Sequence, residues 1–302
     1  MSKRTWLQVA KCLGARELLL TFALVCRQFA RLTDTAELWS ALCRSYGFGA
    51  IKPKHVSSYK LMFRCAVRSR RLLALQDWQG SVQVFDGQKW QRPSLKAPPW
   101  AEWLQCLYDG SVIGATNTGL FWLDQQGSRD LPAALIDRLA PGRVCTVECL
   151  YLFGGVNLSS AESLKLGEQV WTNLPDMPLT LAHFQPCQHR CLLLLAARGL
   201  TLQYFDTKRA MYDSYLLEME LWSAGFADSE SEIYILTPNA LVAVGVSIAS
   251  YRSCQLLRQR TSVAAIYQRG QIFFSESLAR TVVVKRFDPE SLSIRLFLPS
   301  SF

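Results

Sequence analysis

The sequence has no long hydrophobic run. Its longest apolar stretch, residues 191–197, has the length of a strand, whereas a membrane-spanning helix needs about 18 apolar residues or more. The chain also does not open on the basic, apolar and small-residue pattern of a secretory signal. We therefore expect neither a membrane protein nor a secreted one, and we expect the ten cysteines to be reduced thiols.

Histidine is scarce as well, with only His55, His183 and His189 in 302 residues. The sequence contains no phosphate-binding glycine loop, no nucleophile elbow and no His-Glu-x-x-His pattern. Because the sequence has few histidines and none of these catalytic or phosphate-binding motifs, we expect no enzyme activity and no cofactor. A hydrophobic content of 50% with 19% charged residues nevertheless predicts a folded protein.

Charge is divided unevenly along the chain. Residues 1–71 contain 14 Lys and Arg against three acidic residues, a balance of +11, whereas residues 72–302 contain 19 against 21, a balance of −2. Because the large C-terminal part carries no basic excess, we expect no nucleic-acid partner. The division indicates two regions with different roles.

Apolar residues recur at helical spacing in residues 1–47. One predicted helix covers residues 6–13, and a second carries the stripe Leu18, Leu19, Phe22, Val25, Cys26 and Phe29. A third is expected to begin at Asp34 as N-cap, with Glu37 completing a capping box, and to end near Gly47. Three helices of this size bury little surface alone, so their apolar faces need a partner or the next domain.

Three segments of this region resemble an F-box motif: Cys12-Leu13-Gly14-Ala15-Arg16-Glu17-Leu18-Leu19, Leu24-Val25-Cys26-Arg27-Gln28-Phe29, and Leu38-Trp39 with Leu42-Cys43. In that family the motif docks a protein onto the adaptor subunit of a cullin–RING (SCF-type) ubiquitin ligase. The resemblance implies that the adaptor-binding and packing positions are Leu13, Leu18, Leu19, Val25, Cys26, Leu38 and Trp39.

Two other interpretations of this region stay open. The helices can be a structural cap that packs on the following domain. Alternatively, residues 1–16, with Lys3, Arg4, Lys11 and Arg16 and no acid, have the character of a mitochondrial presequence. The helical pattern continues unbroken past residue 16, which argues against a cleaved leader.

Residues 48–71 contain seven basic residues and no acidic one. Their apolar residues predict a helix with one apolar side, made of Tyr59, Leu61, Met62, Phe63 and Val67. Phosphate binding is conceivable for such a segment, but the glycine-rich or aromatic context of a single-strand binder is lacking. We favour a basic connector that faces an acidic protein partner.

From residue 72 onward, strand-like segments alternate with turn residues. An apolar run ending in Asp recurs at Asp86, Asp124, Asp206 and Asp288, with spacings of 38, 82 and 82 residues. Matching runs without Asp lie near residues 165 and 247, which makes six repeats in all. In each repeat an earlier predicted strand precedes the run, at residues 72–75, 111–115, 150–155, 191–197, 233–236 and 271–274. Each Asp can accept backbone N–H groups of the turn that follows it. Short strands repeating at about 40 residues predict a six-bladed β-propeller over residues 72–302, in which the first blade begins at its second strand.

The third repeat resembles a kelch repeat, through Leu150-Tyr151-Leu152-Phe153-Gly154-Gly155, Trp171 and Leu174-Pro175-Asp176-Met177-Pro178. The other five repeats lack the glycine pair, so the array is a degenerate one. A WD-repeat or other propeller is a second possibility, and a β-sandwich with accidental periodicity is a third.

One group of residues has the composition of a metal site: His183, Cys187, His189 and Cys191, with Cys145 and Cys149 in the preceding repeat. The two cysteine pairs occupy equivalent positions in neighbouring repeats, which favours core packing. We expect no metal. A propeller enzyme of the copper-oxidase kind would need more histidines than this region has. Trp100 and Trp103, beside Pro98-Pro99, are either packing residues or exposed anchors.

The expected architecture is a small all-α F-box-like motif (residues 1–47), a basic connector (48–71) and an all-β six-bladed kelch-like propeller (72–302). By resemblance, this is the domain order of a substrate-recognition subunit of an SCF-type E3 ubiquitin ligase. Its partners would be the adaptor and cullin at the helices and a protein substrate on the propeller, in the cytoplasm or the nucleus. The alternative is a non-ligase propeller scaffold whose helices are a structural cap.

Overall fold

A computed structural model provides the three-dimensional structure of the chain. It describes residues 31, 35–46, 48, 57–70, 72–77, 79–86, 88–181, 184–223, 225–228, 232–237, 240–245, 251–255, 265–268, 271–278, 281–288 and 293–297. Two short helices precede a series of antiparallel sheets in these residues. The first two helices expected from the sequence lie outside them.

Helix α5 (Ala36–Ser45) confirms the third expected helix. Its buried residues Leu38, Trp39, Leu42 and Cys43 form one apolar stripe, and the acidic Glu37 in the first turn and basic Arg44 in the last suit the helix dipole. The expected N-cap is wrong, because the helix begins after an extended Thr35. Asp34 and the expected stop at Gly47 lie outside the described residues.

Helix α6 (Tyr59–Ser69) confirms the helix expected in the connector. Ser58 caps it, since its hydroxyl accepts the Leu61 N–H at 3.1 Å. The buried face consists of Met62, Phe63 and Ala66, whereas Leu61, which we expected on the apolar side, is exposed. Ala66 takes the place of Leu61 because it lies three and four residues after Phe63 and Met62 on the same face.

The first three sheets are built from consecutive strands. They comprise β1 (Leu73–Gln76), β2 (Val82–Phe85) and β3 (Trp90–Gln91); β4 (Trp103–Cys106), β5 (Val112–Ala115), β6 (Leu120–Asp124) and β7 (Gly127–Asp130); and β8 (Gly142–Cys145), β9 (Cys149–Phe153), β10 (Ala161–Lys165) and β11 (Trp171–Leu174).

Three further sheets follow in the described residues. They comprise β12 (Cys187–His189), β13 (Leu192–Asp206) and β14 (Met211–Trp222); β15 (Gly225–Asp228), β16 (Glu232–Leu236), β17 (Ala240–Gly245) and β18 (Tyr251–Gln255); and β19 (Ala265–Gln268), β20 (Gln271–Leu278), β21 (Thr281–Asp288) and β22 (Ser293–Phe297). Strands β1, β5, β9, β16 and β20 coincide with strands expected from the repeat. Within the described chain, no strand precedes β1 in the first sheet, as the sequence indicated.

The fourth sheet differs from expectation. Residues 191–197 and the run ending at Asp206 were expected to be separate strands, but both lie in the 15-residue strand β13. The neighbouring β14 has 12 residues and pairs with Arg198 and Gly199 as well as with residues 201–206. The two strands therefore stay paired on both sides of the point where a turn was expected, with a shift in register between Gly199 and Thr201.

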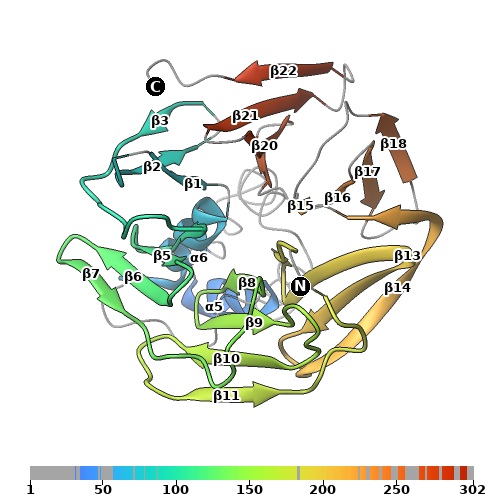
Figure 1. Ribbon diagram of the computed structural model, residues 1–302. Helices are drawn as coiled ribbons and strands as arrows, with labels where there is room; N and C mark the ends of the chain where they lie inside the picture. Colours follow the sequence, from blue (N-terminus) through green and yellow to red (C-terminus); the bar gives the residue numbers. More distant parts are fainter. Residues whose placement is uncertain are drawn as a thin grey trace.

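The six sheets of the described chain lie one after another about a common centre, with later strands toward the periphery (Figure 1). Shared apolar cores join successive sheets from the first to the fifth. Strand β9 shows how: Leu150 and Leu152 pack with residues of the second sheet, whereas Tyr151 and Phe153 pack with residues of the fourth. Alternate side chains of one strand point to opposite faces, so a strand buried on both faces is apolar throughout.

The repeated Asp residues have the local role expected of them. Asp86, Asp124 and Asp206 each accept the backbone N–H two residues further on, at 3.0, 2.7 and 2.8 Å. The turn after Asp288 lies outside the described residues. A second set of such turns was missed: Asp77, Asp109 and Thr146 accept N–H groups two residues on at 2.9, 3.0 and 3.3 Å.

No helix among the described residues is long and apolar enough to cross a membrane.

Replacing Asp86 with Asn should give a pH-dependent loss of stability. Burial acts to raise the pKa of Asp86, but donors from Lys89, Gln88 and Gln91 hold it below its ordinary value. The carboxylate therefore stabilises the fold above the unfolded pKa of about 3.9, and this contribution is lost as the pH falls through the lower folded pKa. We expect Asp86→Asn to lower the free energy of unfolding by about 1 kcal/mol at pH 7.

Urea unfolding of both proteins over a pH series measures this difference, which should shrink toward zero in acid. The exposed Asp130→Asn is the control and should differ little from the original protein at any pH. A difference for Asp86→Asn that stays constant over the series would contradict the assignment.

Candidate functional site

The helices α5 and α6 share one apolar core. Trp39, Tyr46 and Phe48 surround the ring of Phe63, with ring centroids 5.4, 5.0 and 5.3 Å from it. Leu38 and Trp39, two of the residues assigned by resemblance to the adaptor-binding and packing positions, are fully buried here. The structure shows a packing role for both of them.

The other five residues of that assignment, Leu13, Leu18, Leu19, Val25 and Cys26, lie outside the described residues. Contact of the motif with an adaptor therefore stays a prediction.

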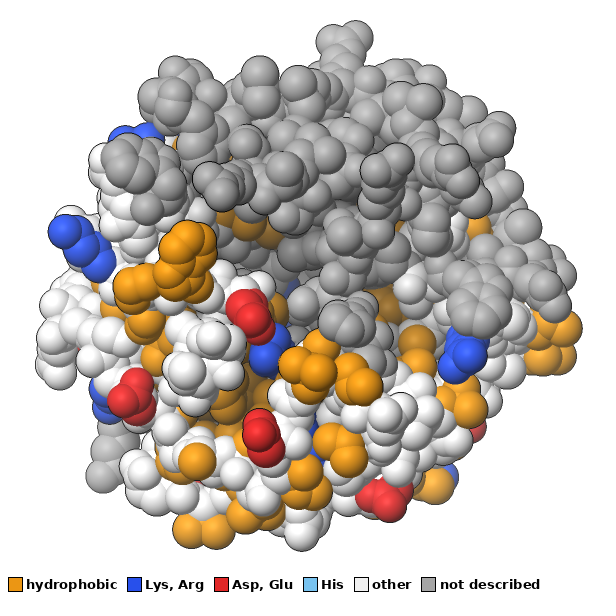
Figure 2. Space-filling model, viewed as in Figure 1, with side chains coloured by type: hydrophobic (Ala, Val, Ile, Leu, Met, Phe, Trp, Pro, Cys, Tyr) orange, Lys and Arg blue, Asp and Glu red, His pale blue; other side chains and the backbone are white. Residues whose placement is uncertain are grey.

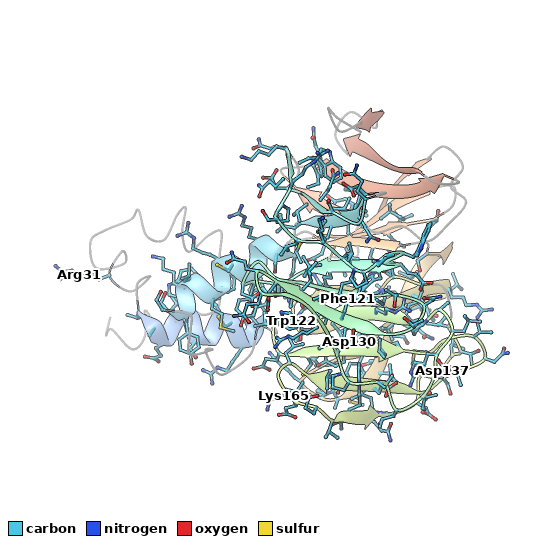
Figure 3. All side chains as sticks on the ribbon, turned by 60° about the vertical axis from the view of Figure 1, so that its left-hand side comes forward. Arg31, Phe121, Trp122, Asp130, Asp137 and Lys165 are labelled. Carbon is cyan, nitrogen blue, oxygen red and sulfur yellow. The ribbon has the colours of Figure 1, made fainter. Side chains whose placement is uncertain are left out.

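The helical pair sits against the turns at the first strands of the second and third sheets. Tyr108, after β4, and Val147, after β8, pack on the helical core. Figure 3 shows the helices on one side of the molecule and the sheets on the other. The helices thus cover one face of the sheet body.

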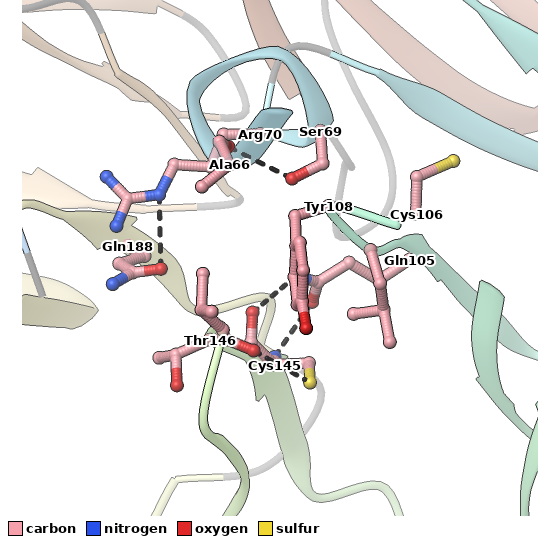
Figure 4. Close-up of a pocket in the computed structure, with 11 residues that line it drawn as sticks. Ala66, Ser69, Arg70, Gln105, Cys106, Tyr108, Cys145, Thr146 and Gln188 are labelled. Atoms are coloured by element: carbon pink, nitrogen blue, oxygen red, sulfur yellow. Dashed lines mark hydrogen bonds between the residues drawn. The ribbon is translucent and has the colours of Figure 1, made fainter. Parts of the chain in front are cut away.

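Arg70, directly after α6, joins the helices to the fourth sheet. Its Nε donates to Gln188 Oε1 at 3.1 Å (Figure 4), and its Nη2 donates to the carbonyls of Tyr46 at 2.9 Å and Arg190 at 3.3 Å. The guanidinium also lies 4.2 Å from the centroid of the Phe48 ring. Burial lowers the pKa of Arg70, and the carboxylate of Asp228 acts in the opposite direction. One side chain thereby connects α5, α6 and β12.

A small pocket lies between the end of α6 and these turns (Figure 4). Its polar groups are engaged with one another: Gln105 donates to the carbonyl of Cys145 and accepts the N–H of Cys145 at 2.9 Å. Ser69 donates to Ala66 O at 3.0 Å. This pocket is part of the junction between helices and sheets.

Three of the possible metal ligands lie among packing residues, and Cys191, at the turn before β13, is partly buried. Cys145, Cys149 and Cys187 belong to or pack against apolar clusters, and burial raises the pKa of each thiol. His189 Nδ1 lies 2.5 Å from Asp228 Oδ1, which joins β12 to β15. His183 lies outside the described residues, and the described ones contain no group of three or more His, Cys, Asp and Glu that could hold a metal.

The face away from the helices is formed by loops. Figure 3 places Asp137, in the β7–β8 loop, on the opposite side of the molecule from the helices. We call residues 131–141, 154–160 and 175–181 the loop platform. Its three segments are joined by backbone hydrogen bonds, from Val156 N to Leu139 O at 2.9 Å, from Gly155 N to Leu181 O at 2.8 Å and from Met177 N to Ser159 O at 2.7 Å.

The glycine pair of the third repeat makes this arrangement possible. Gly154 and Gly155 have φ values of 60° and 130°, which favour glycine. A Cβ on Gly154 would lie 2.4 Å from the Leu181 carbonyl oxygen. The pair is therefore required by the close approach of the three loops.

A buried ion pair fixes the longest segment of the platform. Arg138 Nε lies 2.8 Å from Glu162 Oε1, and both side chains are almost completely buried. Arg138 Nη1 donates to the carbonyls of Gly154 and Ser160 at 2.8 and 2.7 Å, and Glu162 Oε2 accepts the Leu135 N–H at 2.8 Å. Sequence reasoning missed this pair, because Glu162 lies in a strand that also contains Ser163 and Lys165 and gives no sign that its side chain is buried.

The two tryptophans considered as anchors differ. Trp100 is 88% exposed, whereas Trp103 belongs to the core between the second and third sheets. Only the first is available to a partner.

The chain matches no known protein-family model, and a search of curated proteins finds no match either. The similarity of residues 12–43 to an F-box motif and of the third repeat to a kelch repeat therefore rests on the sequence pattern.

Replacing Arg70 with Met should loosen the helices from the sheets. The change removes hydrogen bonds of a charged donor to three partners, and we expect it to lower the free energy of unfolding by about 2–3 kcal/mol. Arg68→Met, on the exposed side of the same helix, is the control and should cost little. Limited proteolysis between α6 and β1, read by mass spectrometry, should be faster in Arg70→Met alone. Equal rates in the two variants would contradict the role of Arg70.

Replacing Arg138 with Ala should lower the free energy of unfolding more than Arg70→Met does. It leaves the buried carboxylate of Glu162 uncompensated, and such a loss costs about 3–5 kcal/mol. Lys165→Ala breaks the exposed pair with Glu168, whose atoms are 2.8 Å apart, and should leave the urea midpoint nearly unchanged. Similar midpoints for the two variants would show that the buried pair does not stabilise the platform.

Proposed function

We propose that this chain is a substrate-recognition subunit of an SCF-type E3 ubiquitin ligase, acting in the cytoplasm or nucleus. Its N-terminal helical motif would dock to the adaptor and thereby to the cullin, and its sheet body would bind the target protein. The observation that carries the proposal is the separation of two surfaces. A helical unit is attached to one face through Arg70, and a set of loops that are hydrogen-bonded to one another and carry exposed apolar side chains occupies the opposite face.

The proposed sheet body is a six-bladed kelch-type propeller. Six sheets of consecutive antiparallel strands in the described chain, with apolar cores between successive members of the first five, support this interpretation. Contacts between first strands of adjacent sheets, as between β4 and β8 and between β15 and β19, are those of blades around an axis. The first sheet would need one more strand to complete its blade.

A receptor of this kind must bind two proteins at once. Separate faces allow this without competition, and the Arg70 contacts hold the two surfaces in a defined relation. The protein itself would perform no chemistry, which agrees with the scarcity of histidine in the sequence.

The burial of Leu38 and Trp39 favours a second candidate. In this alternative the helices are a structural cap, and the protein is a scaffold in which only the sheet body binds partners. The two candidates differ in whether residues 12–29 contact an adaptor.

Co-purification with the cullin–RING adaptor separates them. The tagged full chain is compared with a Leu18→Asp/Leu19→Asp variant, which places two charges in the predicted docking stripe. Recovery of adaptor and cullin with the original chain, reduced at least about tenfold by the variant, is the expected result. A Leu139→Asp/Leu216→Asp variant, with two exposed leucines on the sheet body, is the matched control and should retain the adaptor.

Thermal unfolding and circular dichroism establish that all three proteins are folded. If the folded original chain recovers no adaptor, the receptor proposal is wrong and the scaffold is supported. Equal recovery of the adaptor with both variants would show that Leu18 and Leu19 of the helical motif do not contribute to the adaptor interface.

A further inference from the structure

We infer that the loop platform binds a linear segment of a partner protein that combines Lys or Arg with apolar residues. The inference deepens the proposed function by naming the kind of target segment, and it is tested independently of the adaptor. It rests on the exposed charge of the platform, on its apolar side chains and on its rigidity.

The exposed charge on the platform has one sign. The charged residues of its three segments are Asp137, Arg138 and Asp176. Arg138 is enclosed and paired with Glu162, whereas Asp137 and Asp176 are exposed. The platform therefore presents two carboxylates and no basic side chain at its surface, and a partner with basic residues is complementary to it.

The apolar side chains of the platform surround this charge. Leu135 and Leu139 are 54% and 72% exposed, and they lie two residues before and after Asp137. Exposure alternates along residues 133–139, which is the pattern of an extended chain with one side facing outward. Val156 in the second segment is exposed as well. Figure 2 views this face and shows hydrophobic side chains among scattered acidic and basic ones.

Exposed leucines flanking a carboxylate favour a partner segment with an apolar residue on each side of a Lys or Arg. The basic group would pair with Asp137, and the apolar groups would cover Leu135 and Leu139. Burying these leucines removes apolar surface from water, which supplies affinity, and the charge pair adds selectivity.

The platform is held in place before any partner binds. Backbone hydrogen bonds connect its three segments, and the Arg138–Glu162 pair anchors the segment that carries both leucines. A partner therefore does not have to order these loops on binding, and less of the interaction energy is lost.

Selection of a random dodecapeptide display library on the immobilised full chain tests the inference without assuming a sequence. We expect enriched peptides that contain Lys or Arg with apolar residues beside them. For the best synthetic peptide, fluorescence polarisation should show binding about tenfold weaker for Asp137→Lys and about fivefold weaker for Leu139→Ser.

Matched variants elsewhere serve as controls. Asp130→Lys introduces the same charge change at an exposed site outside the platform, and Leu216→Ser alters a leucine that is 78% exposed on β14. Both should leave peptide affinity unchanged, and added salt should weaken binding to the original chain.

Three results would overturn the inference: no enrichment, enrichment of acidic or uncharged peptides only, or basic peptides whose binding is indifferent to Asp137→Lys and Leu139→Ser. If the adaptor is not recovered but peptides are selected as expected, the receptor role is rejected and the inference that the platform binds peptides is retained. The reverse combination would reject the platform alone.

Discussion

The packing of successive sheets against one another is the interaction on which the rest of this structure depends, and the second, third and fourth sheets each contribute to two of the apolar cores. Strand β9 contributes Leu150 and Leu152 to one core and Tyr151 and Phe153 to another, so a single strand stabilises two interfaces. Apolar side chains on both faces leave each of these three sheets unable to fold in isolation, because one face would always be exposed to water. The sheets are therefore stable only as a series, and the series positions every loop and turn on its two faces.

One face of this series receives the helices. Their core of Trp39, Tyr46, Phe48 and Phe63 is too small to stand alone, and it extends onto Tyr108 and Val147 of the sheet turns. Arg70 adds hydrogen bonds to this apolar contact between helices and sheets, since its guanidinium donates to Gln188 and to two backbone carbonyls. These directional contacts fix the orientation of the helices on the sheets, because hydrogen bonds depend on angle as well as on distance.

On the opposite face, a buried ion pair and its hydrogen bonds hold the loops in place. A charge is costly to bury unless it is paired and hydrogen-bonded. Arg138 and Glu162 pair with each other and hydrogen-bond to three loop carbonyl and N–H groups, and only Arg138 Nη2 of this pair is without a partner among the described residues. The result is a long loop with a fixed course and with its leucines outside. The same pair removes the only basic side chain of the platform from the surface, and this gives the surface its acidic character.

The sequence by itself determined the helix at residues 36–45, the six repeats and the Asp turns, because helical spacing, strand alternation and carboxylate capping are local properties of the chain. It could not determine that residues 192–206 form one strand, since this depends on the length of the neighbouring β14. It also could not distinguish Trp100 from Trp103, or show that the Arg138 side chain is buried and Arg70 partly buried while Arg64 and Arg68 are exposed. Those outcomes follow from partners that are distant in sequence, Gln188 for Arg70 and Glu162 for Arg138. Only the tertiary structure brings such partners within hydrogen-bonding distance.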